Sequence, residues 1–541
     1  WSSDVCSSDL VDKLHIRSRF KNLENVKVDF DEDHLMTVVV GRNGSGKSNV
    51  LEALVAIFRN LDLGEEPPFS YELIYRLGEP RKPNQPSDRW LEITIDADPV
   101  RGTIAKQYQV QVRDLLADDA AKVLFEEQRS GKAIPFSKVK RDKEGKAPYL
   151  PNYVFAYYSG PSDRLENHFK KHRTDFYRRL LKDELDLKGD IRPLFYAKPH
   201  HSQFVLLAFF LSEQDSAEKT FLREHLGIDG LDSIHFVMRQ PGWAKKKGEL
   251  FWGARGVVRR FLDELIKHTL SPVKVTRQED TSLTGSNMRN ECFHLFLHDV
   301  NALREFAKDL SPDELFKMLE STLLSEIISE VSIRVKVSSS KEPLTFRELS
   351  EGEQQLLTVL GLLKFTGGKD SLFLLDEPDT HLNPSWAVKY LKFLREFVPN
   401  HETSHLLMVT HHPLAIAELK KEQVQVMKRD DEQQIIAKMP DESPRGMGIN
   451  LILRSDIFGL QTTLDDDTNQ KLTSRNALAA KETLSKEKIV REEGYQSEDE
   501  EQYLSRLNSE LENLGFNLAT DDPDYLEFLR EKYHPQNKES H

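Results

Sequence analysis

The sequence is poor in cysteine and has no long hydrophobic run. Its 541 residues include only two cysteines, Cys6 and Cys292. Two thiols are too few for a disulfide framework or a cysteine-based metal site, and such scarcity is typical of a reducing compartment. The longest apolar run, Phe204–Leu211, is far shorter than the roughly 18 residues needed to cross a bilayer. We therefore expect a cytoplasmic protein without a membrane partner.

The chain also lacks an excess of positive charge. Its formal net charge is −14 at pH 7, with 38% hydrophobic and 30% charged residues. This composition fits a folded, water-soluble protein and excludes a general polyanion binder. Any surface that binds nucleic acid must therefore be a local basic patch.

The N-terminal stretch WSSDVCSSDL lacks both an initiator methionine and the apolar core of a signal peptide. We expect residues 1–12 to be a non-native or disordered tail, which leaves Cys292 as the one native thiol. Folded structure is expected from about Leu14, beginning with two strands joined by a turn.

Strand and helix patterns alternate in two separate parts of the chain. Leu35–Val40 is a short apolar run rich in β-branched residues, which is typical of a buried parallel strand, and helical periodicity follows it. The same alternation returns after Val331–Val337, a predicted strand. Between the two parts the pattern is mainly helical, and its last helix begins with a capping box of Ser311 and Glu314. The order predicts one α/β unit that is split by a long insertion.

The segment GRNGSGKS matches the phosphate-binding pattern G-x-x-x-x-G-K-[ST] and lies between the predicted strand and helix, as that pattern requires. Glycines let backbone N–H groups surround phosphates, and the helix N-terminus favours negative charge. We expect Lys47 to reach the β and γ phosphates and Ser48 to bind Mg²⁺. The predicted nucleotide-binding residues here are Gly41, Arg42, Asn43, Gly44, Ser45, Gly46, Lys47, Ser48 and Asn49.

Two further strand ends carry side chains suited to phosphoryl transfer. The apolar run LFLL leads into Asp376 and Glu377, and we expect Asp376 to hold Mg²⁺ and Glu377 to polarise the attacking water. The next strand ends in VTHHP, which places His411 to contact the γ-phosphate or orient the water. His412 is expected to be structural. The alternative for all of these side chains is an ordinary polar strand end.

The segment LSEGEQQ begins a predicted helix, and its Ser350 allows two interpretations. Ser350 and Glu353 have the spacing of a capping box, which would simply stabilise the helix N-terminus. A helix N-terminus also favours phosphate, so Ser350 could serve both purposes. The segment alone does not decide between them.

In this order, the phosphate loop, LSEGE, LLDEPDTHLNP and THH resemble the nucleotide-binding heads of the ABC superfamily. The resemblance identifies LSEGE, with Ser350 and Gly352, as the signature motif and Asp379 as part of the D-loop. It implies that two heads pair with ATP between them, so that Ser350 of one head touches the γ-phosphate held by the other. The implied cofactors are ATP and Mg²⁺.

Two features of the sequence depart from the general pattern of the ABC superfamily. No glutamine directly follows a strand where the family's Q-loop should lie, and Tyr158-Ser159 and Gln203 are weak candidates. Lys47 and Ser350 are also much farther apart in the sequence than in transporter heads, which favours the SMC/RecF-like branch that acts on DNA. Long coiled-coil arms are not expected because no sustained heptads occur.

A closer resemblance is to the AAA-type ABC ATPases encoded beside restriction and anti-phage nucleases, including the ATPase of the Septu system. It rests on VVVGRNGSGKSNVLEAL, YYSGPSDRLENHF, LSEGEQQLL and LLDEPDTHLNPSW, within a stretch from about Leu14 to Leu460. It implies a homodimer or higher oligomer and a separate, HNH-type nuclease partner, because the chain after Leu460 shows no strand-borne acidic cluster of the Toprim type.

These expectations divide the chain after its N-terminal tail into four parts. They are the N-terminal lobe of an ATPase head (13–160), a mainly helical insertion (161–330), the C-terminal lobe with signature and Walker B motifs (331–460), and a helical, partner-binding extension (461–541). The expected fold class is α/β, with a mixed sheet flanked by helices. The expected function is an ATPase that controls a nuclease in a defence or restriction system. The alternatives are a RecF-like repair ATPase and a nucleotide-bound scaffold that holds an effector silent with little turnover.

Two basic segments that contain aromatic residues leave DNA as a further partner. They are His168–Arg179 and Trp243–Arg260. Cations interleaved with aromatic rings suit phosphate contact and base stacking. The alternative is a solvated helix face with core aromatics, and the acidic run SEDEE is expected to be a similar solvated face or tail.

Overall fold

The predicted strand at Leu35–Val40 is β3 (Met36–Gly41), and it lies in the interior of a seven-stranded sheet. The computed structural model describes residues 10–30, 34–80, 87–116, 131–142, 144–182, 192–244, 249–280, 287–398, 403–479 and 500–516. The strand order is β18-β17-β3-β16-β15-β8-β9, and every pair is parallel except β17 with β18. The other six strands of this sheet are β8 (Tyr153–Tyr158), β9 (Leu194–Tyr196), β15 (Ser371–Asp376), β16 (Ser404–Val409), β17 (Val424–Arg429) and β18 (Ile435–Lys438).

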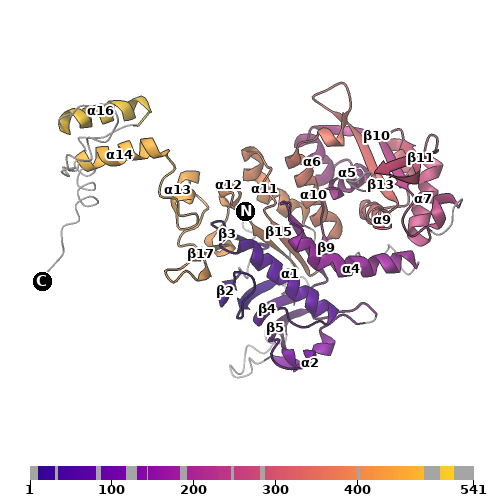
Figure 1. Ribbon diagram of the computed structural model, residues 1–541, viewed down its shortest axis with the longest axis horizontal. Coiled ribbons are helices and arrows are strands. Elements are labelled where there is room, and N and C mark those ends of the chain that lie inside the picture. The colour runs from indigo at the N-terminus through magenta and orange to yellow at the C-terminus, as the bar shows by residue number, and fades with distance from the viewer. Residues whose placement is uncertain are drawn as a thin grey trace. The chain divides into compact units, whose positions relative to one another are not determined.

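Both faces of the seven-stranded sheet are buried, which explains why its central strands are continuously apolar. On β3, Val39 packs on one face with helix α1 (Lys47–Leu63), whereas Val38 and Val40 pack on the other. The second face is covered by helices from the insertion and the C-terminal lobe (Figure 1). They include α5 (His201–Leu211), α9 (Pro312–Leu324), α10 (Glu351–Thr366) and α11 (Pro384–Phe397). The predicted α/β fold class, a mixed sheet flanked by helices, is confirmed.

A second sheet, antiparallel and six-stranded, packs against α1 from the side opposite the central sheet. Its order is β2-β1-β4-β5-β6-β7, and β1 pairs with β2 as the predicted hairpin. Strand β1 already begins at Val11, where Leu10 and Val11 are buried, so the expected tail of residues 1–12 extends too far. Residues 1–9, with Cys6, lie outside the described residues. The strands are β1 (Val11–Ile16), β2 (Val26–Asp29), β4 (Tyr71–Gly78), β5 (Trp90–Ala97), β6 (Tyr108–Asp114) and β7 (Lys132–Ile134).

The insertion contains the expected helices but also a sheet that was not predicted. Five antiparallel strands pair in the order β11-β12-β10-β13-β14. The strands are β10 (Ile228–Arg239), β11 (Val273–Asp280), β12 (Asn287–Leu297), β13 (Ile328–Val337) and β14 (Leu344–Thr345). The predicted strand at Val331–Val337 therefore pairs with the insertion rather than with the central sheet. This part of the chain is a mixed α/β layer, not a mainly helical one.

The remaining helices complete the two lobes and the insertion. The insertion's other helices are α4 (Arg164–Leu181), α6 (Ala217–Glu224), α7 (Gly256–His268) and α8 (Val300–Phe306), and α9 begins with the predicted capping box of Ser311 and Glu314. Short helical turns are α2 (Ile104–Gln107), α12 (Pro413–Ile416), η1 (Phe136–Lys138), η2 (Leu250–Gly253), η3 (Phe346–Glu348) and η4 (Lys421–Gln423).

The chain divides into two compact units. The first comprises Trp1–Ile452 with Asp456–Phe458, and the second comprises Leu453–Ser455 with Gly459–His541. In the second unit α14 (Asp466–Ala479) packs against α16 (Glu500–Asn513) through Leu478 and Leu507. Helix α13 (Ile449–Arg454) runs across the boundary. Among the described residues, no helix has both the length and the apolar character needed to cross a bilayer.

Candidate active site

Four parallel strands bring the predicted site residues to one edge of the central sheet. Asp376, the last residue of β15, is level with Val409 at the end of β16 and with Tyr158 at the end of β8. Strand β16 in turn pairs with β3, which ends at Gly41. Because all four strands run in the same direction, the loops that follow them meet in space, as ligand-binding loops of parallel sheets do.

The phosphate loop joins β3 to α1 through the residues predicted from the sequence. Gly41 ends β3, Ser48 and Asn49 lie in the first turn of α1, and Gly46 is the N-cap residue. Gly46 has φ = 93°, and a Cβ added there would lie 2.5 Å from the Leu23 side chain, so glycine is required for both conformation and space. The turn between β3 and Gly46 contains Arg42, Asn43, Gly44 and Ser45.

The Lys47 ammonium group lies within this loop. Its Nζ donates to the carbonyl oxygens of Gly41 at 2.8 Å and Arg42 at 3.1 Å. Burial lowers the Lys47 pKa, while Glu377 and Asp376 oppose that shift. Within the described part of the chain, the buried Ser45 Oγ has no hydrogen-bond partner. A cation held by weak neutral acceptors, beside an unsatisfied hydroxyl, fits a loop that binds phosphate.

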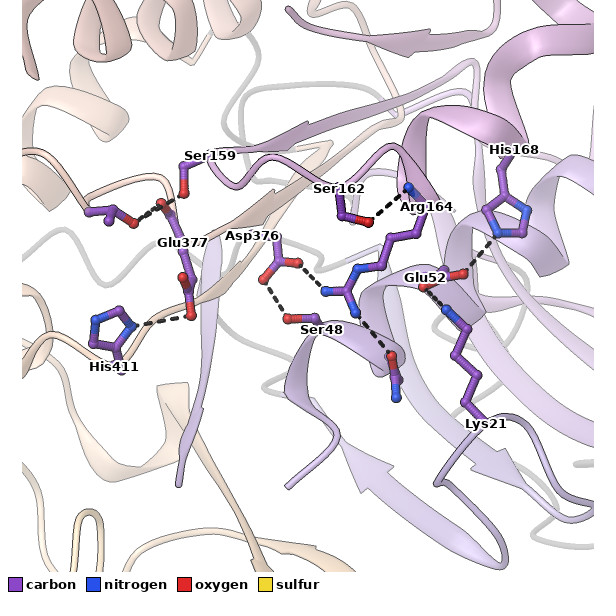
Figure 2. Close-up of polar contacts among 12 residues, drawn as sticks. Lys21, Ser48, Glu52, Ser159, Ser162, Arg164, His168, Asp376, Glu377 and His411 are labelled. Carbon is purple, nitrogen blue, oxygen red and sulfur yellow. Dashed lines mark hydrogen bonds and ion pairs between the residues drawn. The ribbon is translucent and has the colours of Figure 1, made fainter. Parts of the chain in front are cut away.

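The Ser48 hydroxyl and the Asp376 carboxylate meet at the predicted metal position. Ser48 Oγ donates to Asp376 Oδ1 at 2.8 Å, and the Arg164 guanidinium lies 3.2 Å from Asp376 Oδ2 (Figure 2). Burial raises the pKa of Asp376 to about 6, and the Glu377 charge adds to the rise, whereas Ser48 and Arg164 oppose it. A hydroxyl and a carboxylate are oxygen donors of the kind that Mg²⁺ prefers.

The predicted catalytic pair, Glu377 and His411, is also in contact. His411 Nδ1 lies 3.2 Å from Glu377 Oε1, as Figure 2 shows. Glu377 has φ = 51°, a left-handed conformation that is uncommon for a residue other than glycine, and its N–H donates to the Val409 carbonyl at 2.8 Å. His412, by contrast, caps α12 by accepting from the Leu414 N–H, which matches its expected structural role.

Asp379 lies next to this pair but is buried. Its carboxylate accepts a hydrogen bond from Thr410 Oγ1 at 2.7 Å, and burial raises its pKa. Gln355 of α10 accepts from the His381 N–H at 3.1 Å. The loop that carries Asp379 is therefore attached to α10 within the same chain.

Ser350 caps the signature helix and remains exposed. Its Oγ accepts from the Glu353 N–H at 3.3 Å, and its own N–H donates to the Glu353 carboxylate at 2.6 Å, which completes a capping box. Gly352, the second residue of α10, is buried against the Asp379 loop, where a Cβ would lie 2.5 Å from the His381 carbonyl oxygen. The capping interpretation is correct within one chain. Contact with a partner's phosphate stays a prediction.

Arg164 is the side chain at this site that the motif patterns did not identify. It begins α4 after the loop that follows β8, and its guanidinium contacts Asp376, the Asn49 amide oxygen at 3.4 Å and the Tyr158 ring. The segment YYSGPSDRLENHF, on which the closer family resemblance partly rests, contains it. Its place in that segment is the sequence signal that could have singled it out.

The same loop bears on the two weak Q-loop candidates. Ser159 donates its N–H to the Asp376 carbonyl at 3.3 Å, and its hydroxyl lies 3.1 Å from Thr380 Oγ1. Gln203 lies in α5 and lines a different pocket with Leu323. Of the two candidates, Tyr158-Ser159 contributes to the described site contacts and Gln203 does not.

A polar cluster on α1 extends the site toward the first hairpin. Glu52, which is 4% exposed, pairs with Lys21 and with His168, whose Nε2 lies 3.2 Å from Glu52 Oε1 (Figure 2). Asn22, the neighbour of Lys21, donates to the Gly44 carbonyl at 3.0 Å. These contacts hold the first hairpin and α4 against the phosphate loop.

The two basic segments are partly neutralised or lie outside the described residues. On α4, Lys171 pairs with Glu65, Arg173 with Glu166, and Arg178 with Asp175.

In the second segment the aromatic side chains are structural. Phe251 and Trp252 are buried, and Trp243 Nε1 donates to the Ser325 carbonyl at 2.8 Å. Residues 245–248, which include the three consecutive lysines, are not among the described residues, and neither are residues 497–499 of the acidic run. The described contacts favour a solvated, ion-paired face over a stacking platform.

Comparisons with known proteins agree with this geometry. Residues 11–190 match the family described as "AAA ATPase domain", and residues 288–417 match "AAA domain, putative AbiEii toxin, Type IV TA system". The chain is 26% identical over 189 residues to the Septu protein PtuA of Bacillus mycoides (strain KBAB4); the match covers 32% of this chain and 26% of that protein. The chain thus matches about a quarter of that relative's length.

Two solved structures are also similar, with low TM-scores and low sequence identity. The SMC head bound to the C-winged helix domain of ScpA has a TM-score of 0.30 and 13% identity, and covers 80% of this chain and 98% of its own. The SMC head domain from Thermotoga maritima has a TM-score of 0.31 and 11% identity, with the same coverage. The expected kinship with AAA-type ATPases, including the ATPase of the Septu system, rests on the two domain matches and on the PtuA similarity. At this level it is confirmed: the chain carries an AAA-type ATPase domain in two segments.

Proposed function

We propose that this AAA-type ATPase binds ATP with Mg²⁺, pairs two heads around the nucleotide, and hydrolyses ATP with Glu377 as the general base. The observation that carries the proposal is the meeting of three strand ends at one edge of the sheet, where Ser48 contacts Asp376 and His411 contacts Glu377. A phosphate loop, an acidic pair and a histidine in this arrangement have the parts that phosphoryl transfer to water requires.

The residues at the metal position fit Mg²⁺. Ser48 and Asp376 would hold the ion, which neutralises charge on the β and γ phosphates. Lys47 would exchange its two carbonyl acceptors for phosphate oxygens, a gain because their negative charge attracts the ammonium group. Arg164 would leave Asp376 or share it with the ion.

In the hydrolysis step the water oxygen attacks the γ-phosphorus while the bond from that atom to the β–γ bridging oxygen breaks. Glu377 accepts the proton that the water loses, and ADP and phosphate are the products. His411 holds Glu377 Oε1 and so orients the carboxylate. Glu377 adopts its left-handed backbone conformation directly after the end of β15.

Head pairing would complete each site with the signature of the partner chain. Ser350 is exposed at the N-terminus of α10, where the helix end and the hydroxyl can approach a phosphate. The buried link from Gln355 to the Asp379 loop would connect that helix to the catalytic strand ends. ATP would therefore lie between a phosphate loop and a signature from different chains.

The proposed output is control of a separate nuclease, of the HNH type, in an anti-phage defence or restriction system. This part rests on the sequence resemblance and on the similarity to the Septu protein PtuA. DNA is a further proposed partner. If the gene beside this one encoded no nuclease, the defence assignment would lose its main support.

The test of the catalytic proposal is Glu377→Gln, which keeps size and hydrogen bonding but cannot accept a proton. We expect ATP binding to persist and turnover to fall about 100-fold or more, the usual contribution of a general base. The matched control is Glu396→Gln on the exposed side of α11, where turnover should stay at the wild-type level. Wild-type turnover in the Glu377 variant would overturn the assignment.

A further inference from the structure

A second polar pocket lies at the far end of the two helices that begin at the ATP site. Helix α1 runs from Lys47 in the phosphate loop to Asp62 in its last turn, about 22 Å away. Helix α4 runs from Arg164 beside Asp376 to Arg179 in its last turn. Both helix ends line a pocket of about 1140 Å³, which residues 141–142, 145–148, 152–153, 192–193 and 368–369 complete.

Two buried side chains of this pocket have polar atoms without a hydrogen-bond partner among the described residues. Arg192 is 6% exposed; its Nη2 binds Glu320 at 2.8 Å, but its Nε and Nη1 have no hydrogen-bond partner. His172 is 7% exposed; its Nε2 binds Asp62 at 2.8 Å, but its Nδ1 has none. Buried groups of this kind are costly to leave unsatisfied, so an arginine held in this state is suited to receive an anion.

Among the lining cations, Arg179 and part of the Arg192 guanidinium are available to an anion. Five lining residues are Lys or Arg and three are Asp; Arg141 pairs with Asp62, Lys146 with Glu144, Arg192 with Glu320 through Nη2, and Lys369 with Glu79. Arg179 is exposed at the rim and has no ion pair among the described residues. The lining cations are Arg141, Lys146, Arg179, Arg192 and Lys369, and the acids are Asp62, Asp142 and Asp175.

The pocket also has aromatic walls, and its volume of about 1140 Å³ is slightly above the usual range for ligand sites. Phe176 and Tyr153 line it beside the cations. Ligand pockets of this kind combine a few placed polar groups with apolar or aromatic walls, in volumes of roughly 300–1,000 Å³. The other described cations of the α4 segment are mostly ion-paired, so the geometry favours one phosphate position rather than a continuous track for nucleic acid.

We propose that this pocket binds a nucleoside 5′-phosphate, with the phosphate on Arg192 and Arg179 and the base against Phe176 or Tyr153. The ligand is distinct from the ATP that the phosphate loop holds. It could come from two sources, a free nucleotide or the 5′-phosphorylated end of a nucleic acid. The His172–Asp62 pair joins α4 to α1 and lines this pocket. Both helices begin at the ATP site, so the pair connects the proposed ligand to the helices of that site.

The test measures binding to the full chain with Lys47→Ala, which weakens the phosphate loop. The probes are AMP, a 5′-phosphorylated trinucleotide and the same trinucleotide without the phosphate, each titrated calorimetrically. We expect one site per chain for AMP or for the phosphorylated trinucleotide, and which of them binds identifies the source. The unphosphorylated trinucleotide should bind about tenfold more weakly or worse, because it lacks the charged acceptor for the arginines.

Variants then assign that site to the pocket. Arg179→Glu changes an exposed rim residue and should weaken binding about tenfold or more, as should Arg192→Gln if that chain folds. Lys170→Glu makes the same change of charge on an exposed residue of α4 outside the pocket, and it should leave binding unchanged. No saturable binding of either phosphorylated probe, or binding unaffected by Arg179→Glu, would overturn the proposal.

Discussion

The Ser48 hydroxyl donates to the Asp376 carboxylate at 2.8 Å, across 328 positions of the sequence. One residue belongs to the helix after the phosphate loop and the other ends β15, and the strand β16 lies between β15 and β3. The contact therefore depends on the correct order of the parallel strands and joins the two lobes of the head. It also defines the position at which the proposed Mg²⁺ would bind.

Arg164 should compete with Mg²⁺ for Asp376. Arg164→Gln removes the cation while keeping a hydrogen-bonding side chain, so the Mg²⁺ concentration that gives half-maximal ATPase activity should fall about two- to fivefold, as for a partly exposed ion pair. A Mg²⁺ titration at saturating ATP measures this. Lys170→Gln on the same helix is the control, and an unchanged Mg²⁺ dependence in Arg164→Gln would show that the ion pair is not part of the working site.

Gly352 should be required for the attachment of the signature helix to the Asp379 loop. In Gly352→Ala the added Cβ would lie 2.5 Å from the His381 carbonyl oxygen, so α10 or the loop must shift. We expect the free energy of unfolding to fall by about 1–3 kcal/mol, as for other overpacked sites, and the ATPase activity to fall with it.

Urea unfolding of Gly352→Ala would measure that change. Gly230→Ala is the control, because a Cβ there meets nothing within 4 Å. Equal stability of the Gly352 variant and the wild type would show that the loop yields freely, and the proposed link from signature to catalytic strands would lose its basis.

His405 should make the fold sensitive to acid. It is fully buried on β16, its Nδ1 accepts from the Val11 N–H at 3.2 Å, and burial lowers its pKa from 6.5 to about 3. As pH falls below about 6.5, His405 gains a proton in the unfolded chain but not in the folded chain. The contribution of neutral His405 to the free energy of unfolding is therefore complete above that pH. It is lost between about pH 6.5 and 3, at up to about 1.4 kcal/mol per pH unit.

The variant His405→Asn keeps an acceptor for the Val11 N–H but has no proton to gain. Its free energy of unfolding, measured by urea titration from pH 7.5 to 5, should depend less steeply on pH than that of the wild type. The difference in slope should correspond to at most one proton taken up on unfolding. An identical pH dependence would contradict the buried, neutral state of His405.

The parts of the site that were predictable from the sequence are those carried by short, contiguous patterns. Lys47 comes after an apolar strand rich in β-branched residues, and Asp376 ends a leucine-rich one. In both cases the strand, the site residue and the helix or turn that follows are close together in the sequence. Arg164 has no such pattern, because its role depends on a strand, β8, that lies beside β15 only in the folded sheet.

The sheet of the insertion was missed for a related reason. Strand β10 contains Gly230 and two aspartates, and β12 carries charged residues at its start. Neither therefore shows the strict alternation of apolar and polar residues that predicts a strand. These strands are stabilised by antiparallel pairing with each other and with β13, far away in the sequence, and tertiary pairing of this kind outweighs local propensity.

The most direct test of the central claim, that each ATP lies between a phosphate loop and the signature of another chain, is the ATPase activity of a mixture of two inactive variants. Ser350→Arg places bulk and charge at the exposed signature, and Lys47→Ala disables the phosphate loop. Each homodimer should be nearly inactive, since both of its composite sites are broken. After subunit exchange, one site of the heterodimer combines the intact loop of the first chain with the intact signature of the second, and part of the activity should return. Full activity of a folded Ser350→Arg chain alone, which is what a purely capping serine would allow, would contradict the account.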